Sequence, residues 1–242
     1  MKKRRQRLRK AIILISFLFF PITLNYFSPV LIIMGAAEGI IVASFIMFAI
    51  QFLSALFLGR AFCGWLCPAA GLQEMCFSAN DNKVKTGKAD WIKWMIWIPW
   101  ISIIIITFVK AGGFHSIRPL YMFENGISVD EPMAYILYFT VVGVFVILSL
   151  LVGRRAFCHY GCWMSPFMII GRKIRNIFKW PALHLESDNE KCIDCKACTK
   201  ACPMSIDPNT MVRKQNMEHA ECILCGNCID VCPKNAIEYG FS

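Results

Sequence analysis

The residues whose type and spacing could do chemistry are cysteines, and eight of the thirteen stand in the last 60 residues of the chain. They form two runs with the same spacing, C-x2-C-x2-C-x3-C-P, in "CIDCKACTKACP" and "CILCGNCIDVCP". Thiolate sulfur is a soft ligand that binds iron, copper and zinc. The doubled pattern therefore predicts two neighbouring metal centres.

The spacing favours iron–sulfur clusters, because this run holds [4Fe–4S] clusters in bacterial two-cluster ferredoxins. There the fourth cysteine of each run ligates the cluster of the other run. Zinc takes its ligands as two pairs and leaves the three-plus-one pattern unexplained, and disulfides are disfavoured in a reducing cytoplasm. We expect cluster 1 on Cys192, Cys195, Cys198 and Cys232, and cluster 2 on Cys222, Cys225, Cys228 and Cys202.

Four further cysteines form two pairs, each just after a long apolar run. Cys63 and Cys67 lie in "GRAFCGWLCP", and Cys158 and Cys162 lie in "GRRAFCHYGCWMSP". A spacing of i and i+4 puts both thiols on one face of a helix. The two pairs together could hold a further Fe–S cluster or a soft metal ion. Thiol–disulfide chemistry, or simple packing of small apolar side chains, are the alternatives.

The amino-acid composition is more apolar than that of a typical soluble domain and indicates a membrane environment. Of the 242 residues, 57% are hydrophobic and 17% are charged, whereas soluble domains carry about 25% charged residues. We predict four transmembrane helices with membrane lipid around them, the second of them near Ile40–Leu58 within a longer run. The apolar runs are Ala11–Tyr26, Val30–Gly59, Trp91–Val109 and Ala134–Val152. The alternative for the first run, a secretory signal peptide, lacks small residues close to its charged head.

The distribution of charge predicts the topology. Residues 1–182 hold 20 Lys and Arg against 7 Asp and Glu, and 18 of those 20 lie at one end of the predicted spans. The positive-inside rule then indicates a multi-pass protein of a prokaryotic inner membrane with both termini cytoplasmic. Because these basic residues act as topology signals, we do not expect nucleic acid as a partner, despite the net charge of +10.

The chain therefore divides into three predicted parts. They are a basic cytoplasmic N-terminus over residues 1–10, a membrane domain over 11–182 and a cytoplasmic ferredoxin domain over 183–242. Cys63 and Cys158 are 95 residues apart, which suggests two repeated hairpins in the membrane domain. The predicted fold is a mainly α membrane protein with four transmembrane helices, followed by an α+β bacterial-type two-[4Fe–4S] domain.

Membrane hairpins that end in "FCGWLCP"-like motifs, followed by a doubled "CxxCxxCxxxCP", resemble the NapH/NosR/CcoG-type membrane polyferredoxins. The resemblance covers nearly the whole chain and implies electron transfer at a membrane. NapH-like members are regarded as quinol dehydrogenases, and CcoG-like members are linked to metal reduction. This chain departs from the pattern at Trp163, which replaces a proline after Cys162, and it lacks a sequence for covalent flavin attachment.

The predicted function is a relay of single electrons between a cytoplasmic or quinol donor and a membrane-associated redox partner protein. The expected cofactors are two [4Fe–4S] clusters, with a third cluster or metal ion at the membrane cysteines and a quinone as further candidates. No catalytic residue is identified, so any enzymatic role is that of a quinol dehydrogenase subunit. The alternatives are a metal reductase or redox-maturation factor that uses the membrane cysteines, and a non-catalytic anchor for a ferredoxin module.

Overall fold

Helices make up most of the chain, as the long apolar runs predict. The computed structural model describes residues 2–123 and 126–242, so Met1 of the predicted N-terminal segment lies outside it. Four helices of eight or more residues, those that begin at Pro29, Pro68, Pro132 and Ser165, have a proline in their first turn, where a missing N–H costs nothing. In the first 182 residues the helices are α1 (Lys2–Leu18), α2 (Phe20–Thr23), α3 (Pro29–Ala37), α4 (Ala43–Leu58), α5 (Ala61–Trp65), α6 (Pro68–Met75), α7 (Ile92–Lys110), α8 (Pro132–Leu151), α9 (Ala156–Tyr160) and α10 (Ser165–Phe178).

Two helices are long and apolar enough to cross a membrane by themselves. They span Lys88–Lys110, which contains α7, and Pro132–Leu151, which is α8. A third candidate is the pair Arg4–Leu18 and Phe20–Phe27, if the two helices, bent by 59° at their junction, form one span. The apolar helix α4 is shorter, because β1 (Ile40–Ile41) occupies the start of the predicted second span and pairs in parallel with β2 (Ser116–Ile117). The chain is thus mostly helical with candidate membrane helices, and four spans are not confirmed.

The helices around the two membrane cysteine motifs pack in a crossed arrangement. In the first repeat α4 precedes the motif on α5 and α6 follows it; in the second α8 precedes the motif on α9 and α10 follows it. The helix α10 packs along α4, and α6 packs between α1 and α8. Each helix that follows a motif thus contacts the helix that precedes the other motif. The predicted packing of two separate hairpins is not confirmed.

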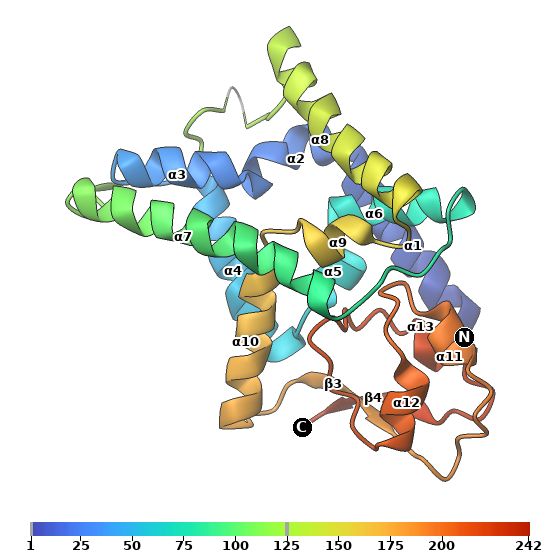
Figure 1. Ribbon diagram of the computed structural model, residues 1–242. Coiled ribbons are helices and arrows are strands. Elements are labelled where there is room, and N and C mark those ends of the chain that lie inside the picture. The colour runs from blue at the N-terminus through green and yellow to red at the C-terminus, as the bar shows by residue number, and fades with distance from the viewer. Residues whose placement is uncertain (1, 124–125) are drawn as a thin grey trace.

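The C-terminal part is a small α+β unit that lies against the N-terminal end of α1 and the middle of the helical part (Figure 1). Strands β3 (Leu183–Ser187) and β4 (Ile237–Phe241) pair antiparallel, with Leu185 opposite Tyr239. The short helices α11 and α13 pack on each other, and each follows the first two cysteines of one run and contains the third. The helices of this unit are α11 (Ala197–Ala201), α12 (Pro208–Arg213) and α13 (Asn227–Val231).

The first helix differs from the prediction in its extent and its contacts. It runs without a break across the predicted boundary between residues 10 and 11. Its basic end therefore does not stand apart as a free N-terminal segment, and α1 contacts both α6 and α13. The helix links the membrane part to the C-terminal unit.

Candidate functional site

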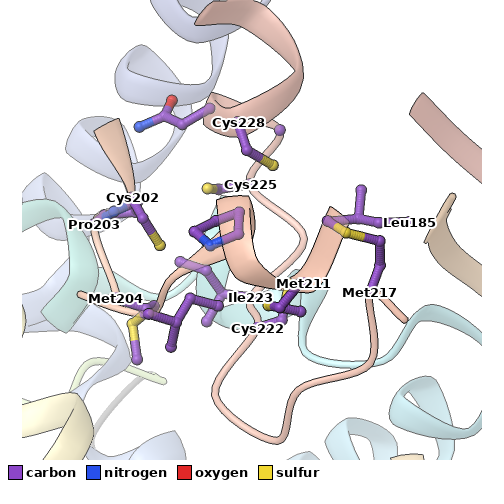
Figure 2. Close-up of a pocket in the computed structure, with 14 residues that line it drawn as sticks. Leu185, Cys202, Pro203, Met204, Met211, Met217, Cys222, Ile223, Cys225 and Cys228 are labelled. Carbon is purple, nitrogen blue, oxygen red and sulfur yellow. The ribbon is translucent and has the colours of Figure 1, made fainter. Parts of the chain in front are cut away.

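The structure gathers the eight tail cysteines around two cavities. We call the first the outer cavity; its cysteines are Cys192, Cys195, Cys198 and Cys232. The second, the inner cavity, is lined by Cys202, Cys222, Cys225 and Cys228, and Figure 2 shows Cys202, Cys225 and Cys228 on neighbouring segments of the chain. The two groups are those that the motif spacing predicts. That each group holds a cluster stays a prediction.

The inner cavity suits an anionic cluster because it is apolar and its sulfurs receive backbone hydrogen bonds. The N–H groups of Met204 and Ile206 point at the sulfur of Cys202, and the N–H of Leu224 points at Cys222. Burial outweighs these bonds and raises the pKa of Cys202 to about 12 and that of Cys222 to about 11. Coordination to iron would favour the thiolate form and release these protons to solvent.

The two cavities differ in their access to water. At the outer cavity Cys195 is exposed and Ile193 is 57% exposed. At the inner cavity Ile223, the residue equivalent to Ile193 in the second run, is 2% exposed. The inner cavity is covered by the membrane part of the chain.

The loop of the inner cavity packs directly on the first membrane cysteine motif. The indole N–H of Trp65 donates to the carbonyl of Leu224 at 3.1 Å, and the amide of Gln6 donates to the carbonyl of Cys225 at 3.0 Å. A Cβ atom at Gly64 would collide with the carbonyl of Ile223, so only glycine permits this approach. The inner cysteines and Cys63 thus belong to one packed region.

The four membrane cysteines converge from the two repeats and are buried. Gln73 donates a hydrogen bond to the sulfur of Cys158 at 3.3 Å, and Met168 contacts the sulfur of Cys63 at 3.3 Å. Gln73 stands six residues after Cys67, and Met168 stands six residues after Cys162. Equivalent positions of the two repeats therefore reach the first cysteine of the other repeat.

Two buried ion clusters flank these four cysteines. In the first, Arg9 and Arg155 share Glu74, and both guanidinium groups are fully buried. The guanidinium of Arg155 also donates to the carbonyl of Cys63 at 2.8 Å. Burial alone would raise the pKa of Glu74, but Arg155 and Arg9 outweigh it and lower the pKa to about 2.

In the second ion cluster, Arg60 and Lys93 share Glu221 of the C-terminal unit. Arg60 is 2% exposed and Lys93 is 1% exposed. Burial alone would raise the pKa of Glu221, but the positive charges of Arg60 and Lys93 outweigh this effect and lower the pKa to about 2. Because this pKa lies below its ordinary value of 4.5, the pairing stabilises the junction above about pH 4.5, and the stabilisation is lost as the pH falls toward 2.

The first ion cluster has two cations and one carboxylate and leaves one positive charge in excess, whereas in the second Asp90 acts on Lys93 as a further carboxylate. Asp90, which bonds His159 at 2.9 Å, lies at the edge of the second cluster, where water reaches it. An uncompensated buried charge is costly. An oxidised [4Fe–4S] core bound by four thiolates carries a net charge of about −2 and would neutralise this excess.

No three His, Cys, Asp or Glu side chains among residues 2–123 and 126–242 come close enough to share a single metal ion. In a cubane cluster each thiolate binds a different iron atom, so its ligands need not meet at one point. The arrangement of the cysteines is compatible with clusters.

A large apolar cavity adjoins the membrane cysteines. Its volume is about 430 Å³, and Cys67, Pro68 and Ala69 form part of its wall. The rest of the wall is apolar and aromatic, and comes mainly from η1 (Leu24–Phe27), α3, α8 and the region of α9 and α10. The cavity is large enough for a ring-shaped organic ligand. A second apolar cavity of about 370 Å³, between α4, α7 and α10, includes no cysteine.

Sequence reasoning missed several residues of this site. The basic residues of the first helix and Arg60 were interpreted as topology signals, yet Arg9 and Arg60 are buried in the ion clusters. Gln73 and Glu74 carried no recognised motif. The signal that could have found Arg60 and Arg155 is their equivalence, since each stands three residues before the first cysteine of its repeat.

Comparison with known proteins places these observations in a family. The family model "4Fe-4S dicluster domain" matches residues 184–233, and the model "4Fe-4S binding domain" matches residues 40–86 and 134–181. The last two ranges contain the membrane cysteine pairs. The chain is similar to the ferredoxin-type protein NapH and to the regulatory protein NosR of Stutzerimonas stutzeri.

The relatives align over most of the chain. An uncharacterized protein of Methanocaldococcus jannaschii is 26% identical over 82% of this chain and 72% of its own length. The methylamine utilization ferredoxin-type protein MauN of Methylorubrum extorquens is 24% identical over 74% of the chain and 61% of its own length. The ferredoxin-type protein NapH of Haemophilus influenzae is 23% identical over 74% of the chain and 62% of its own length. No solved structure matches the chain at a significant level.

These findings confirm the predicted resemblance and, at a coarse level, the predicted function. The chain is a membrane protein with 4Fe-4S domains and homologues of the ferredoxin type. Its electron donor and its partner are not identified by the comparisons.

The close approach at Gly64 can be tested by adding one methyl group. We expect Gly64→Ala to push the inner-cavity loop away from the first cysteine motif and to increase cleavage between the two parts by limited proteolysis. Gly143→Ala on α8 is the matched control, because a Cβ there meets nothing within 4 Å. Equal cleavage of the two variants would contradict the close packing.

The second ion cluster can be tested by neutralising its carboxylate. Glu221→Gln leaves Arg60 and Lys93 buried without the carboxylate that they share, so we expect a loss of about 3–5 kcal/mol in the free energy of unfolding in detergent. Glu218→Gln is the control, because Glu218 pairs with Arg172 at a partly exposed site, where about 0–1 kcal/mol is expected. Similar losses in the free energy of unfolding in both variants would show that the buried ion cluster stabilises the protein no more than the partly exposed pair does.

Proposed function

We propose that this protein relays single electrons between a soluble carrier at the outer cavity and a lipid-soluble quinone at the apolar cavity beside Cys67. The outer and inner cavities hold [4Fe–4S] clusters 1 and 2 on the cysteines predicted from the spacing. The four membrane cysteines hold a third cluster, which lies between cluster 2 and the quinone.

The observation that carries this proposal is the continuity of the cysteine sites. Cys63 and Cys158 pack in one apolar cluster with Cys202 and Cys225 of the inner cavity. Cys67 lies on the wall of the large apolar cavity. A redox group at each site would therefore lie next to the redox group at the following site. The series would run from the exposed side of the C-terminal unit to the apolar cavity.

The third cluster is supported by charge and by the matching family model. The two ion clusters bring an excess of positive charge to four buried thiols, and thiolates bound to a cluster would balance it. The "4Fe-4S binding domain" model matches both segments that supply these thiols. Packing alone gives no reason for the buried cations.

A quinone suits the apolar cavity because its wall is almost free of polar groups. Phe20, Phe145, Phe157 and Trp163 surround the space, and aromatic walls favour flat rings. A bound quinone would exchange electrons with the adjacent cysteine site. Its two electrons would then be transferred one at a time. The chain's own residues exclude water and position the ring beside Cys67.

The proposed topology follows the charge distribution. Four spans, formed by the bent pair at the N-terminus, α4, α7 and α8, would place both termini in the cytoplasm of a prokaryotic cell. The C-terminal unit would then face the cytoplasm, where the reducing environment protects exposed clusters. Lipid would surround the exposed apolar side chains of α7 and α8, such as Met95 and Leu151.

Iron analysis tests the third cluster. Anaerobically purified protein should contain about twelve irons per chain, whereas clusters in the tail alone would give about eight. The double substitution of Cys63→Ala and Cys158→Ala should lower the value to about eight, and Cys76→Ala should leave it unchanged. A value of eight in the unaltered protein would contradict the third cluster, and a different bound metal lost with these cysteines would favour a metal-handling role.

The quinone site can be tested by filling the cavity. Ala69→Phe should slow the bleaching of the clusters by a reduced short-chain quinol at least several-fold, because the new ring occupies the space beside Cys67. Ala49→Phe, which fills the second apolar cavity, is the control and should leave the rate unchanged. Reduction by dithionite should be the same in both variants. If Ala49→Phe is the slower variant, or if no quinol bleaches the clusters, the proposed site is wrong.

A further inference from the structure

The outer cavity opens on the surface of the C-terminal unit, away from the membrane cysteines. Its lining includes an apolar residue at the surface, Ile193, which is 57% exposed. Cys195, which also lines the cavity, is exposed. Exposed apolar residues beside a redox site are typical of a surface that contacts another protein.

The charged residues that line this cavity are all lysines, although Asp188, Glu190, Asp194 and Glu238 lie around it. Lys191, Lys196 and Lys234 contribute to its lining, and no Asp or Glu does. The carboxylates of Asp188 and Asp194, which lie close by in the chain, are already engaged in ion pairs with Lys191 and Arg213. In the described parts of the chain, 2–123 and 126–242, neither Lys196 nor Lys234 has an ion-pair partner. Glu190, which is exposed, is the remaining acidic residue of this segment.

The backbone at Lys196 makes glycine a suitable test substitution at this position. Lys196 has φ +57°, a left-handed conformation that strains any residue with a Cβ. The equivalent position in the second run is Gly226, with φ +75°, which adopts this conformation without strain. The inner cavity has glycine where the chain must turn, whereas the exposed outer cavity has a strained lysine.

We propose that the rim of the outer cavity, formed by Ile193, Cys195, Lys196 and Lys234, is the docking surface for a soluble, acidic one-electron carrier protein. The two lysines steer an acidic surface toward the rim, and the apolar contact at Ile193 brings the carrier's cofactor close to the outer cysteines. In the exchange the carrier loses one electron and the outer site gains it, or the reverse, and no bond forms or breaks. This inference rests on the proposed function, because it assumes a cluster at the outer cavity.

Binding of a reduced, acidic flavodoxin provides the test, with the full-length protein in detergent. Lys196→Gly removes the charge and also relieves the backbone, so it should not harm folding. Lys179→Gly is the matched control, because Lys179 is also an exposed lysine with φ +56°, but lies at the end of α10. A second variant, Lys234→Gln, tests the other side of the rim without a change in backbone preference.

We expect the Kd for flavodoxin to rise about threefold or more in Lys196→Gly and in Lys234→Gln, and to stay unchanged in Lys179→Gly. The Kd of the unaltered protein should rise with salt, and the difference between the variants should vanish at high salt. The rate of cluster reduction by flavodoxin should follow the Kd, whereas reduction by a neutral photoreductant should be the same in all variants. Equal Kd values for Lys196→Gly and Lys179→Gly, salt-independent binding, or tighter binding of a basic cytochrome would each overturn the proposal.

The result is separable from the test of the proposed function. Iron content and bleaching by quinol are measured on the same preparations without flavodoxin. If quinol reduces the clusters while the Kd for flavodoxin is unchanged by substitution of Lys196 and Lys234, the proposed docking surface is wrong. The proposed electron relay would not be affected by that result.

Discussion

The structure depends on a buried junction in which cations outnumber carboxylates. Arg9, Arg155 and Glu74 on one side, and Arg60, Lys93 and Glu221 on the other, enclose the region where the membrane cysteines meet the C-terminal unit. Groups like these are stable in a low dielectric only when the whole set is close to neutral. In the proposed third cluster, thiolates of the four buried cysteines would supply the missing negative charge. The charge of the junction and the chemistry of its cysteines therefore explain each other.

The same junction fixes the C-terminal unit in place. The carbonyls of Leu224 and Cys225 receive hydrogen bonds from Trp65 and Gln6, and Gly64 allows the two backbones to touch. A fixed arrangement matters for electron transfer, because the rate falls steeply with distance. The two repeats add to this rigidity through the crossed contacts of Gln73 with Cys158 and of Met168 with Cys63. The proposed relay thus has its sites held by packing, without a flexible tether.

Sequence alone could predict the parts that depend on local spacing. The grouping of the tail cysteines follows from a doubled motif, and the candidate membrane helices follow from long apolar runs such as Trp91–Val109. It could not predict the packing of α10 on α4, because nothing in an amphipathic stretch says which helix it will meet. It also assigned the basic residues to topology, since a buried arginine is recognisable only when its carboxylate, 65 residues away for Arg9, has been placed beside it. The apolar cavity beside Cys67 could likewise not be predicted from the sequence, because its wall comes from segments that are far apart in the chain.

The central claim is that cluster 2 and the membrane cysteine site are adjacent redox centres within one packed junction. Electron paramagnetic resonance of the fully reduced protein measures this most directly, because neighbouring paramagnetic clusters split each other's signals. The account predicts a spectrum with magnetic interaction among three centres, which simplifies to that of an interacting pair when Cys63 and Cys158 are both replaced by alanine. A spectrum of only two interacting clusters, unchanged by that replacement, would contradict it.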